Sequence, residues 1–593
     1  MYDQTTPISP HVDRPGYHLT EDLADRAIEW IRRQRAGAPD RPWFCYFATP
    51  AVHAPHHAPK EWIDRFAGTF DDGWDALRTA IHRTQIDLGV IPPGTVDTAR
   101  PSEIPAWEDY PERYRPVATR LMECFAGFLA HTDHHIGRVI EEARQLDSAD
   151  GTETLIIYLT GDNGASAEGT IHGAWSAPSF QNGVPEDPEW LLERISDFGT
   201  ERCENHFNVG WAWALDAPFK WMKQVASHFG GTRNGMALEW SGRIHDPGAI
   251  RSQFHHVVDI TPTILDAAGV EPPTRVNGLA QMPIDGISML YTLDGESPSR
   301  RHTQYFEILG NRGIYHDGLM ASCFHGRVPW IRMQAFEFDG PQERWELYDI
   351  TSDFSQSIDL ADERPEALER LRRLFDEEAR RHGVYPLRDA GSRRGGDRSV
   401  PDPLSGRTSM TYTTAHVRMP ESSVINLKNC SWRISTEIDL DERGDGVIVC
   451  QGGNMAGWSL WLDARRPRFT YNCFGHVITS VGSVEHLAPG HHRIDVTFAY
   501  DGGFGRGGEL LMVIDGSAVD GARLERTVPL VFSMSGETFD VGTDTGSHVT
   551  DYPGGSACTA GIRFVELRRL DEPDPETRRL VAEGMFRAGL STQ

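Results

Sequence analysis

Leu155-Ile156-Ile157-Tyr158-Leu159-Thr160-Gly161-Asp162-Asn163-Gly164 is a stretch that changes character at its centre. The first half is apolar and rich in residues that favour strands, which predicts a buried strand of a parallel sheet. The second half is a tight polar turn that places Asp162 and Asn163 at the carboxyl end of that strand, where open α/β sheets bind ligands. Both side chains offer the hard oxygen atoms that Ca²⁺ and Mg²⁺ prefer. From these residues alone, an Asx-turn and a metal site are equally good interpretations.

The composition limits the classes of protein to consider. A chain of 593 residues is too long for one core, so we expect two or more domains. The formal net charge of -28 argues against general binding to nucleic acid or to an anionic membrane, and we expect neither partner. The 8 cysteines are scattered without a CxxC pair, which favours free thiols in a reducing compartment such as the cytoplasm. We find no signal-peptide pattern and no apolar run of transmembrane length.

Residues 1–387 alternate between predicted helices and strands, which indicates an α/β domain with a mixed sheet flanked by helices. The expected helices cover residues 19–33, with Thr20 as N-cap, and residues 117–145, 252–269 and 363–381. The expected strands cover residues 43–48, 154–160, 236–240, 304–309, 318–324 and 344–350.

The character of the sequence changes after residue 387. Residues 388–408 are rich in Gly, Arg, Ser and Pro and are predicted to be a linker. Residues 409–593 contain short segments of alternating polarity, which predicts an all-β sandwich closed by a helix at 574–585. This part resembles the concanavalin- and laminin-G-like jelly rolls. Carbohydrate binding, oligomerisation and a purely structural role all fit it, with the structural role favoured.

Three polar loops follow the predicted strands of the first domain. They contain His53, the Asp162–Asn163 turn, and the segment from Lys223 to His228. We expect these loops to converge at one edge of a sheet.

The residues around these loops carry a resemblance to the sulfatase family, in particular to large bacterial arylsulfatases of the alkaline-phosphatase-like superfamily. The resemblance extends over about residues 17–385. It rests on HAPHHAP at 53–59, TGDNG at 160–164, KQVASHFGGTRNG at 223–235, DITPTILDAAG at 259–269, IDGISM at 284–289 and WELYDITSDFSQSIDLA at 345–361. It implies hydrolysis of a small-molecule sulfate ester to an alcohol or phenol and sulfate.

The resemblance also implies roles for individual residues. Asp162 and Asn163 match one half of the family's divalent-cation site, which usually holds calcium. Lys223 matches the lysine that binds a sulfate oxygen, and His53 matches the histidine that contacts the sulfate and the ester oxygen. His228 is a possible substrate contact. Asn163 favours a sulfatase over the related phosphodiesterases, which resemble sulfatases but carry His at this position.

One departure from the family is large. Sulfatases use a cysteine in Cys-x-Pro/Ala-x-Arg that is converted to formylglycine, and none of the 8 cysteines here fits that pattern. The family's paired metal-binding aspartates are missing too. We therefore expect the chain to begin after the family's N-terminal segment and to lack turnover by itself. The alternatives are a non-catalytic, carbohydrate-binding pseudo-sulfatase and, with less support, a relative of the phosphodiesterases.

Overall fold

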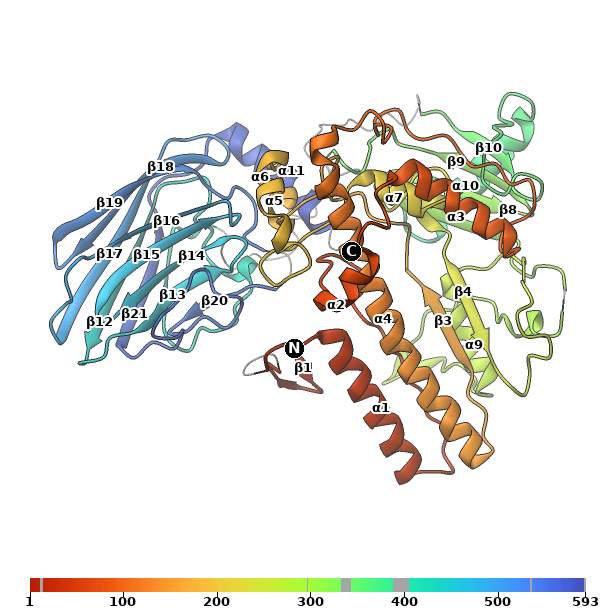
Figure 1. The fold of residues 1–593 in the computed structure, drawn as a ribbon, viewed down its shortest axis with the longest axis horizontal. Coiled ribbons are helices and arrows are strands. Elements are labelled where there is room, and N and C mark those ends of the chain that lie inside the picture. The colour runs from red at the N-terminus through yellow and green to blue at the C-terminus, as the bar shows by residue number, and fades with distance from the viewer. Residues whose placement is uncertain are drawn as a thin grey trace. The chain divides into compact units, whose positions relative to one another are not determined.

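The computed structural model describes residues 1–10, 14–295, 297–331, 343–387, 404, 406–533 and 536–590. These residues form two compact units (Figure 1). Unit 1 contains Met1–Gly173, Phe207–Trp330 and the described residues of 343–387. Unit 2 contains Ala174–His206, Ile331 and the described residues from 404 onward.

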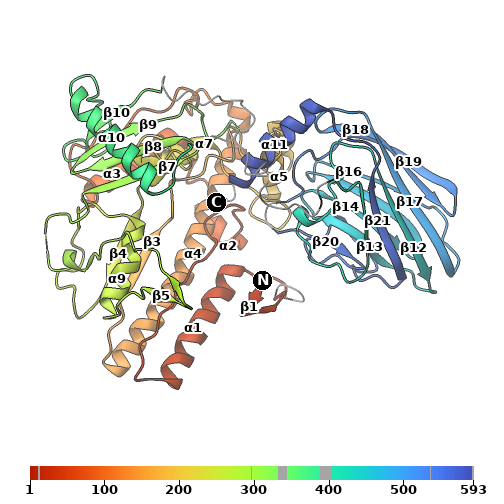
Figure 2. The ribbon, with the colours of Figure 1, turned by 180° about the vertical axis from the view of Figure 1, so that it is seen from behind.

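Two long helices of unit 1 lie side by side in both views (Figures 1 and 2). They are α1 (Leu19–Gly37) and α4 (Arg115–Asp150). The N-cap of α1 is His18, not the predicted Thr20, because His18 Nδ1 accepts the backbone N–H of Thr20 at 3.2 Å. Arg32 of α1 forms two parallel hydrogen bonds of 2.8 and 2.6 Å with Glu142 of α4, the strong bidentate geometry for this pair.

The apolar residues that precede the Asp162–Asn163 turn form β3 (Ile156–Thr160). Among the described residues its partner is β4 (Gly235–Glu239), and the pair is antiparallel, with Thr160 opposite Gly235. The predicted parallel pairing is therefore wrong. A short apolar run identifies a strand, but it does not reveal the direction of the neighbouring strand.

The four-stranded sheet of unit 1 is antiparallel, with strand order β10-β9-β8-β7. Its strands are β7 (Thr303–Ile308), β8 (Asn311–His316), β9 (Leu319–Cys323) and β10 (Glu346–Asp349). Helix α10 (Pro365–Arg381) buries Leu371, Phe375 and Ala379 in a cluster with Ile314 and Leu347 of the sheet. This packing explains the apolar stripe that predicted the helix.

The remaining elements of unit 1 are short, apart from α3. They are α2 (Lys60–Ile63), α3 (Gly73–Asp87), α7 (Val209–Leu215), α8 (Phe229–Thr232), α9 (Ile260–Ala267) and the strands β1 (Tyr2–Asp3), β2 (Thr6–Pro7), β5 (Arg275–Val276) and β6 (Leu279–Ala280). The helix predicted from residue 252 begins only at Ile260, after a single 3₁₀ turn. None of the helices in the described part of the chain combines the length and the apolar character that a membrane crossing needs.

One predicted strand does not form. Residues 43–48 form no regular secondary structure and pair with no strand among the described residues, and Phe44 and Tyr46 remain 62% and 83% exposed. The apolar character of this segment suits a sheet interior, but a strand exists only where a neighbouring strand supplies hydrogen bonds.

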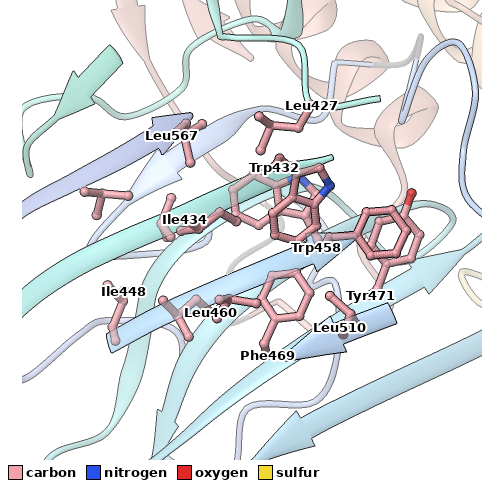
Figure 3. Packing of buried hydrophobic residues seen from close by; sticks show 14 of the residues in the cluster. Leu427, Trp432, Ile434, Ile448, Trp458, Leu460, Phe469, Tyr471, Leu510 and Leu567 are labelled. Atoms are coloured by element: carbon pink, nitrogen blue, oxygen red, sulfur yellow. The ribbon is translucent and has the colours of Figure 1, made fainter. Parts of the chain in front are cut away.

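Unit 2 is built around an all-β sandwich, as predicted. One sheet has the order β11-β21-β12-β17-β18-β19 and the other β16-β15-β14-β13-β20, and all pairs are antiparallel. The strands are β11 (Ser409–Tyr412), β12 (Trp432–Leu440), β13 (Gly446–Gly452), β14 (Gly457–Asp463), β15 (Arg466–Cys473), β16 (Val477–Gly482), β17 (Gly490–Tyr500), β18 (Arg506–Ile514), β19 (Ser517–Arg526), β20 (Phe539–Val541) and β21 (Gly561–Arg569), followed by helix α11 (Pro575–Leu590). Alternate side chains such as Trp432, Ile434, Leu460 and Phe469 fill the core (Figure 3).

Unit 2 also contains a segment from the middle of the chain. Ala174–His206, with helices α5 (Ala177–Gln181) and α6 (Pro188–Glu193), belongs to this unit. The buried Asn182 side chain donates to Val531 O at 2.8 Å and accepts from Leu530 N at 2.7 Å. His476 Nε2 lies 3.0 Å from Glu186 Oε1. The predicted linker at 388–408 lies mostly outside the described residues, so the predicted domain boundaries remain a prediction.

Candidate functional site

The β3–β4 ladder brings two of the three polar loops together. Because Thr160 pairs with Gly235, the turn that follows β3 and the segment that precedes β4 leave the same end of the ladder. Gly164 N donates to Gly231 O at 3.2 Å, and Lys223 N donates to Ala165 O at 3.1 Å. The Asp162–Asn163 turn and the Lys223 segment are therefore held against each other by backbone hydrogen bonds.

Glycines make this close approach possible. A Cβ atom on Gly164 would lie 1.7 Å from Gly230 O, and a Cβ atom on Gly230 would lie 2.2 Å from Lys220 O. Neither position has room for a side chain. Gly164 is thus explained by backbone contact between the two loops, and Gly230 by backbone contact within its own loop.

The third loop reaches the same place through His53. Lys223 Nζ lies 3.4 Å from His53 Nε2, although the residues are 170 positions apart. His53 Nδ1 lies 2.8 Å from Ala54 O and must donate to that carbonyl, so in the neutral ring Nε2 carries the lone pair that faces the ammonium group. Lys223 is buried and His53 is exposed. An ammonium group and an imidazole thus meet at the surface, as the sequence suggested.

The two oxygen-bearing side chains of the turn also interact. Asn163 Nδ2 donates to Asp162 Oδ1 at 2.6 Å, so Asp162 Oδ2 and Asn163 Oδ1 are the other hard ligands that the turn offers. This donor set fits Ca²⁺ or Mg²⁺ in kind, but Ca²⁺ takes six to eight oxygens. Among the described residues, the groups of at least three His, Cys, Asp or Glu that could hold an ion are Glu21–His131–His135 and Cys450–Asp540–Asp544. Neither group includes Asp162.

His228 lies in the same loop but inside the protein. Its Nδ1 lies 2.9 Å from Ser227 Oγ and its Nε2 lies 2.9 Å from Glu346 Oε2. Both ring nitrogens therefore have protein partners, and the ring is buried. His228 therefore links the loop to Glu346 of β10 through a buried contact.

The structure also separates the two lysines of this loop. Lys220 Nζ donates to the hydroxyl group of Tyr348 at 3.1 Å. Lys223 Nζ, three residues later, points to His53. Lys223 is thus the lysine that shares a location with the other polar loops.

Sequence reasoning missed one residue of the site. Asp216 is half-buried, and its Oδ1 accepts the N–H of Ala165 at 3.0 Å, directly behind the turn. Burial raises the pKa of this carboxyl group well above its usual range. Asp216 follows a short apolar helix, and nothing in its local sequence distinguishes it from an ordinary helix-ending residue.

Comparisons with known proteins agree with the motifs. Residues 1–270 match the sulfatase family. An uncharacterized sulfatase of Schizosaccharomyces pombe is 26% identical over 368 residues, which are 61% of this chain and 61% of that protein. An arylsulfatase of Klebsiella aerogenes is 26% identical over 298 residues, 50% of this chain and 59% of the relative. The matched regions thus span about 60% of the length of these curated relatives.

Solved structures give more distant likenesses. A protein of glycosaminoglycan metabolism in Bacteroides thetaiotaomicron superposes with a TM-score of 0.35 and 16% identity, covering 60% of this chain and 54% of that chain. A protein in complex with its substrate D-glucosamine-2-N,6-O-disulfate superposes with a TM-score of 0.31 and 15% identity, covering 62% and 71%. Residues 1–270 therefore match the sulfatase family in sequence and in the motifs around His53, Asp162 and Lys223.

Proposed function

We propose that this chain is the greater part of an arylsulfatase-type sulfuric ester hydrolase, and that it holds part of the active site. The observation that carries the proposal is the approach of Lys223 Nζ to His53 Nε2 beside the Asp162–Asn163 turn. Three segments that are distant in sequence thereby present an ammonium group, an imidazole and two oxygen ligands at one end of a strand pair. The match to the sulfatase family supplies the reaction class.

In the proposed site, the Lys223 ammonium group binds a sulfate oxygen and offsets its charge. The Ala54 carbonyl fixes the orientation of His53, so Nε2 faces the position of the ester. When protonated there, His53 donates a proton to the departing ester oxygen. Asp162 and Asn163 would hold a divalent cation, calcium in the first place, which when bound neutralises further charge on the sulfuryl group.

We also propose that residues outside this chain complete the site. β3 pairs only with β4 among the described residues, and residues 43–48 form no strand there and leave Phe44 and Tyr46 exposed. A further strand placed there would cover apolar surface and satisfy a free sheet edge. The nucleophile and the remaining cation ligands would come with it.

Binding and turnover test these proposals separately. We expect the purified chain to bind an aryl sulfate in a calorimetric titration with Ca²⁺ and to lose that binding in Lys223→Met. Lys220→Met is the matched control, because Lys220 contacts Tyr348 instead, and it should bind like the parent chain. Equal loss in both variants, or no binding by the parent chain, would count against the assigned site.

Turnover is measured on the same samples. We expect hydrolysis of the aryl sulfate only from a chain extended upstream in frame with a Cys-x-Pro/Ala-x-Arg motif. Rapid hydrolysis by the 593 residues alone would overturn the proposal that the site is completed from outside.

A second candidate function is non-catalytic binding of a sulfated or sugar ligand. The observation that favours it is the absence of the nucleophile motif from all 593 residues. It predicts saturable binding that no upstream extension converts into turnover, and that changes in the β-sandwich abolish. A phosphodiesterase is disfavoured by Asn163, and we expect no cleavage of an aryl phosphodiester.

A further inference from the structure

Two imidazoles and a carboxylate that take no part in the proposed sulfate site converge between α1 and α4. His131 and His135 lie one turn apart on α4, and their Nε2 atoms are 3.1 Å apart. Glu21 lies in the first turn of α1. One ligand atom of each of these three residues lies within 4.8 Å of the other two.

The protons of the two imidazoles can be assigned from their neighbours. Arg138 Nη1 lies 2.9 Å from His135 Nδ1, and a guanidinium group can only donate, so His135 Nδ1 accepts. The proton of neutral His135 is then on Nε2 and points to His131 Nε2. His131 Nε2 therefore carries a lone pair, and His131 Nδ1 is a buried N–H that has no hydrogen-bond partner.

This arrangement has the geometry of a metal site. Two Zn–N bonds of about 2.05 Å that meet at roughly 100° would place their nitrogen atoms about 3.1 Å apart. His131 already holds the tautomer that ligates through Nε2. Both histidines are buried, whereas Glu21 is exposed, so the carboxylate side is open to solvent. Two histidines and one glutamate leave a position for water, as in open zinc sites.

We propose that Glu21, His131 and His135 bind a late first-row divalent cation, Zn²⁺ in the first place. The ligands are the two Nε2 atoms and one carboxylate oxygen, with water in the remaining position. Imidazole ligands favour Zn²⁺, Cu²⁺ or Ni²⁺ over Ca²⁺, so this site differs in metal preference from the Asp162–Asn163 turn. His18, whose ring lies 4.3 Å from that of His131, is not a ligand, because it caps α1 and its Nε2 lies 3.1 Å from His57 O.

Arg138 competes with the metal in this proposal. Ligation through His135 Nε2 moves the ring proton to Nδ1, where it faces the Arg138 guanidinium group. Arg138 must then give up this contact and keep its 2.6 Å hydrogen bond to Asp25. A glutamine at position 138 would instead offer a carbonyl oxygen to the Nδ1 proton, the kind of outer partner that supports metal-binding histidines.

The second group of potential ligands does not support a similar proposal. Cys450, Asp540 and Asp544 are all buried. Asp540 Oδ2 accepts from Thr538 Oγ1 at 2.9 Å and from both the N–H and the hydroxyl group of Thr545 at 3.2 and 2.9 Å. These hydrogen bonds already satisfy the carboxylate without an ion.

The test is a calorimetric titration of the full chain with Zn²⁺ after dialysis against a chelator. We expect the parent chain to bind one equivalent more than His135→Ala or Glu21→Gln, and we expect an excess of Ca²⁺ not to displace it. Loss of a residue that only hydrogen-bonds a metal ligand lowers metal affinity by about 10–100-fold. Loss of a ligand itself should lower the affinity for this Zn²⁺ ion by more than that. Co²⁺ should give a visible absorption band in the parent chain that these two variants lack.

Two further variants make the test specific. His134→Ala, one residue from the site and exposed, should bind Zn²⁺ like the parent chain. Arg138→Gln should bind Zn²⁺ more tightly, a gain that partial unfolding cannot produce. Equal stoichiometry in the parent chain, His135→Ala and Glu21→Gln, or the same loss in His134→Ala, would overturn the proposal.

Discussion

Asp216 Oδ1 accepts the backbone N–H of Ala165 at 3.0 Å, and Ala165 lies two residues after Asn163. The other carboxylate oxygen of Asp216, Oδ2, is buried and has no hydrogen-bond partner. A buried carboxylate with one donor is costly when charged, which is why its pKa is raised. Asp216 therefore orders the turn at the expense of stability.

Replacing Asp216 separates the benefit of its hydrogen bond to Ala165 from the cost of its buried charge. Asp216→Asn keeps an acceptor for Ala165 and removes the buried charge, so we expect it to stabilise unit 1 by about 1–3 kcal/mol at pH 8. Asp216→Leu leaves the Ala165 N–H without a partner and should destabilise unit 1 by about 1–3 kcal/mol. Urea unfolding of both variants measures the difference, and equal stability of the two would contradict this role.

The contact between Gly164 and Gly230 predicts a severe effect of one methyl group. Gly164→Ala must displace the Gly230 carbonyl, and we expect a loss of at least about 3 kcal/mol, together with weaker aryl sulfate binding. Gly137→Ala is the control, because this helical glycine has nothing within 4 Å of its Cβ position and should gain about 0.5–1 kcal/mol. Tolerance of Gly164→Ala would show that the loops are not packed as described.

The His228–Glu346 contact predicts a loss of stability in acid. Burial would raise the pKa of Glu346, but the hydrogen bond with His228 and the charge of Lys220 outweigh it and lower the pKa to about 2. Because the folded pKa is below the ordinary 4.5, the stabilisation is present above pH 4.5 and is lost as the pH falls toward 2. We expect Glu346→Gln to lower the free energy of unfolding by about 2 kcal/mol at pH 6 and by less at pH 3. The partial exposure of the side chain limits the size of this loss. A cost that does not change between these pH values would refute the contact.

Glu537 of unit 2 predicts the opposite trend. Burial raises the pKa of Glu537 to about 7, against hydrogen bonds from Ser547 N and Oγ. Because the folded pKa is above the ordinary 4.5, the contribution of Glu537 to the free energy of unfolding is complete below pH 4.5. It is lost as the pH rises through 7. Glu537→Gln should become more stable than the parent chain by up to about 3 kcal/mol as the pH rises from 4.5 to 8. Calorimetry of both proteins across that range measures the change, and parallel pH curves would exclude it.

Local patterns in the sequence predicted much of the fold. Apolar residues mark the side of each element that faces a core, as a stripe in residues 363–381 and by alternation in residues 409–569. Helix α10 and the sandwich were therefore predictable. The proximity of His53 and Lys223 followed from the motifs. The failure at 43–48 and the antiparallel pairing of β3 have a common cause, because strand pairing depends on distant residues. Asp216 and the membership of Ala174–His206 in unit 2 were hidden for the same reason.

The segment Ala174–His206 has a consequence for synthesis of the chain. Ala174 and His206 exchange backbone hydrogen bonds of 3.0 and 2.9 Å, so the segment can close on itself as soon as it leaves the ribosome. Its anchor, Asn182, binds Leu530, a residue 348 positions later. At about 5–20 residues per second, this partner is translated roughly 20–70 seconds afterwards. During that interval unit 2, in which Phe180 and Leu191 are buried, is incomplete.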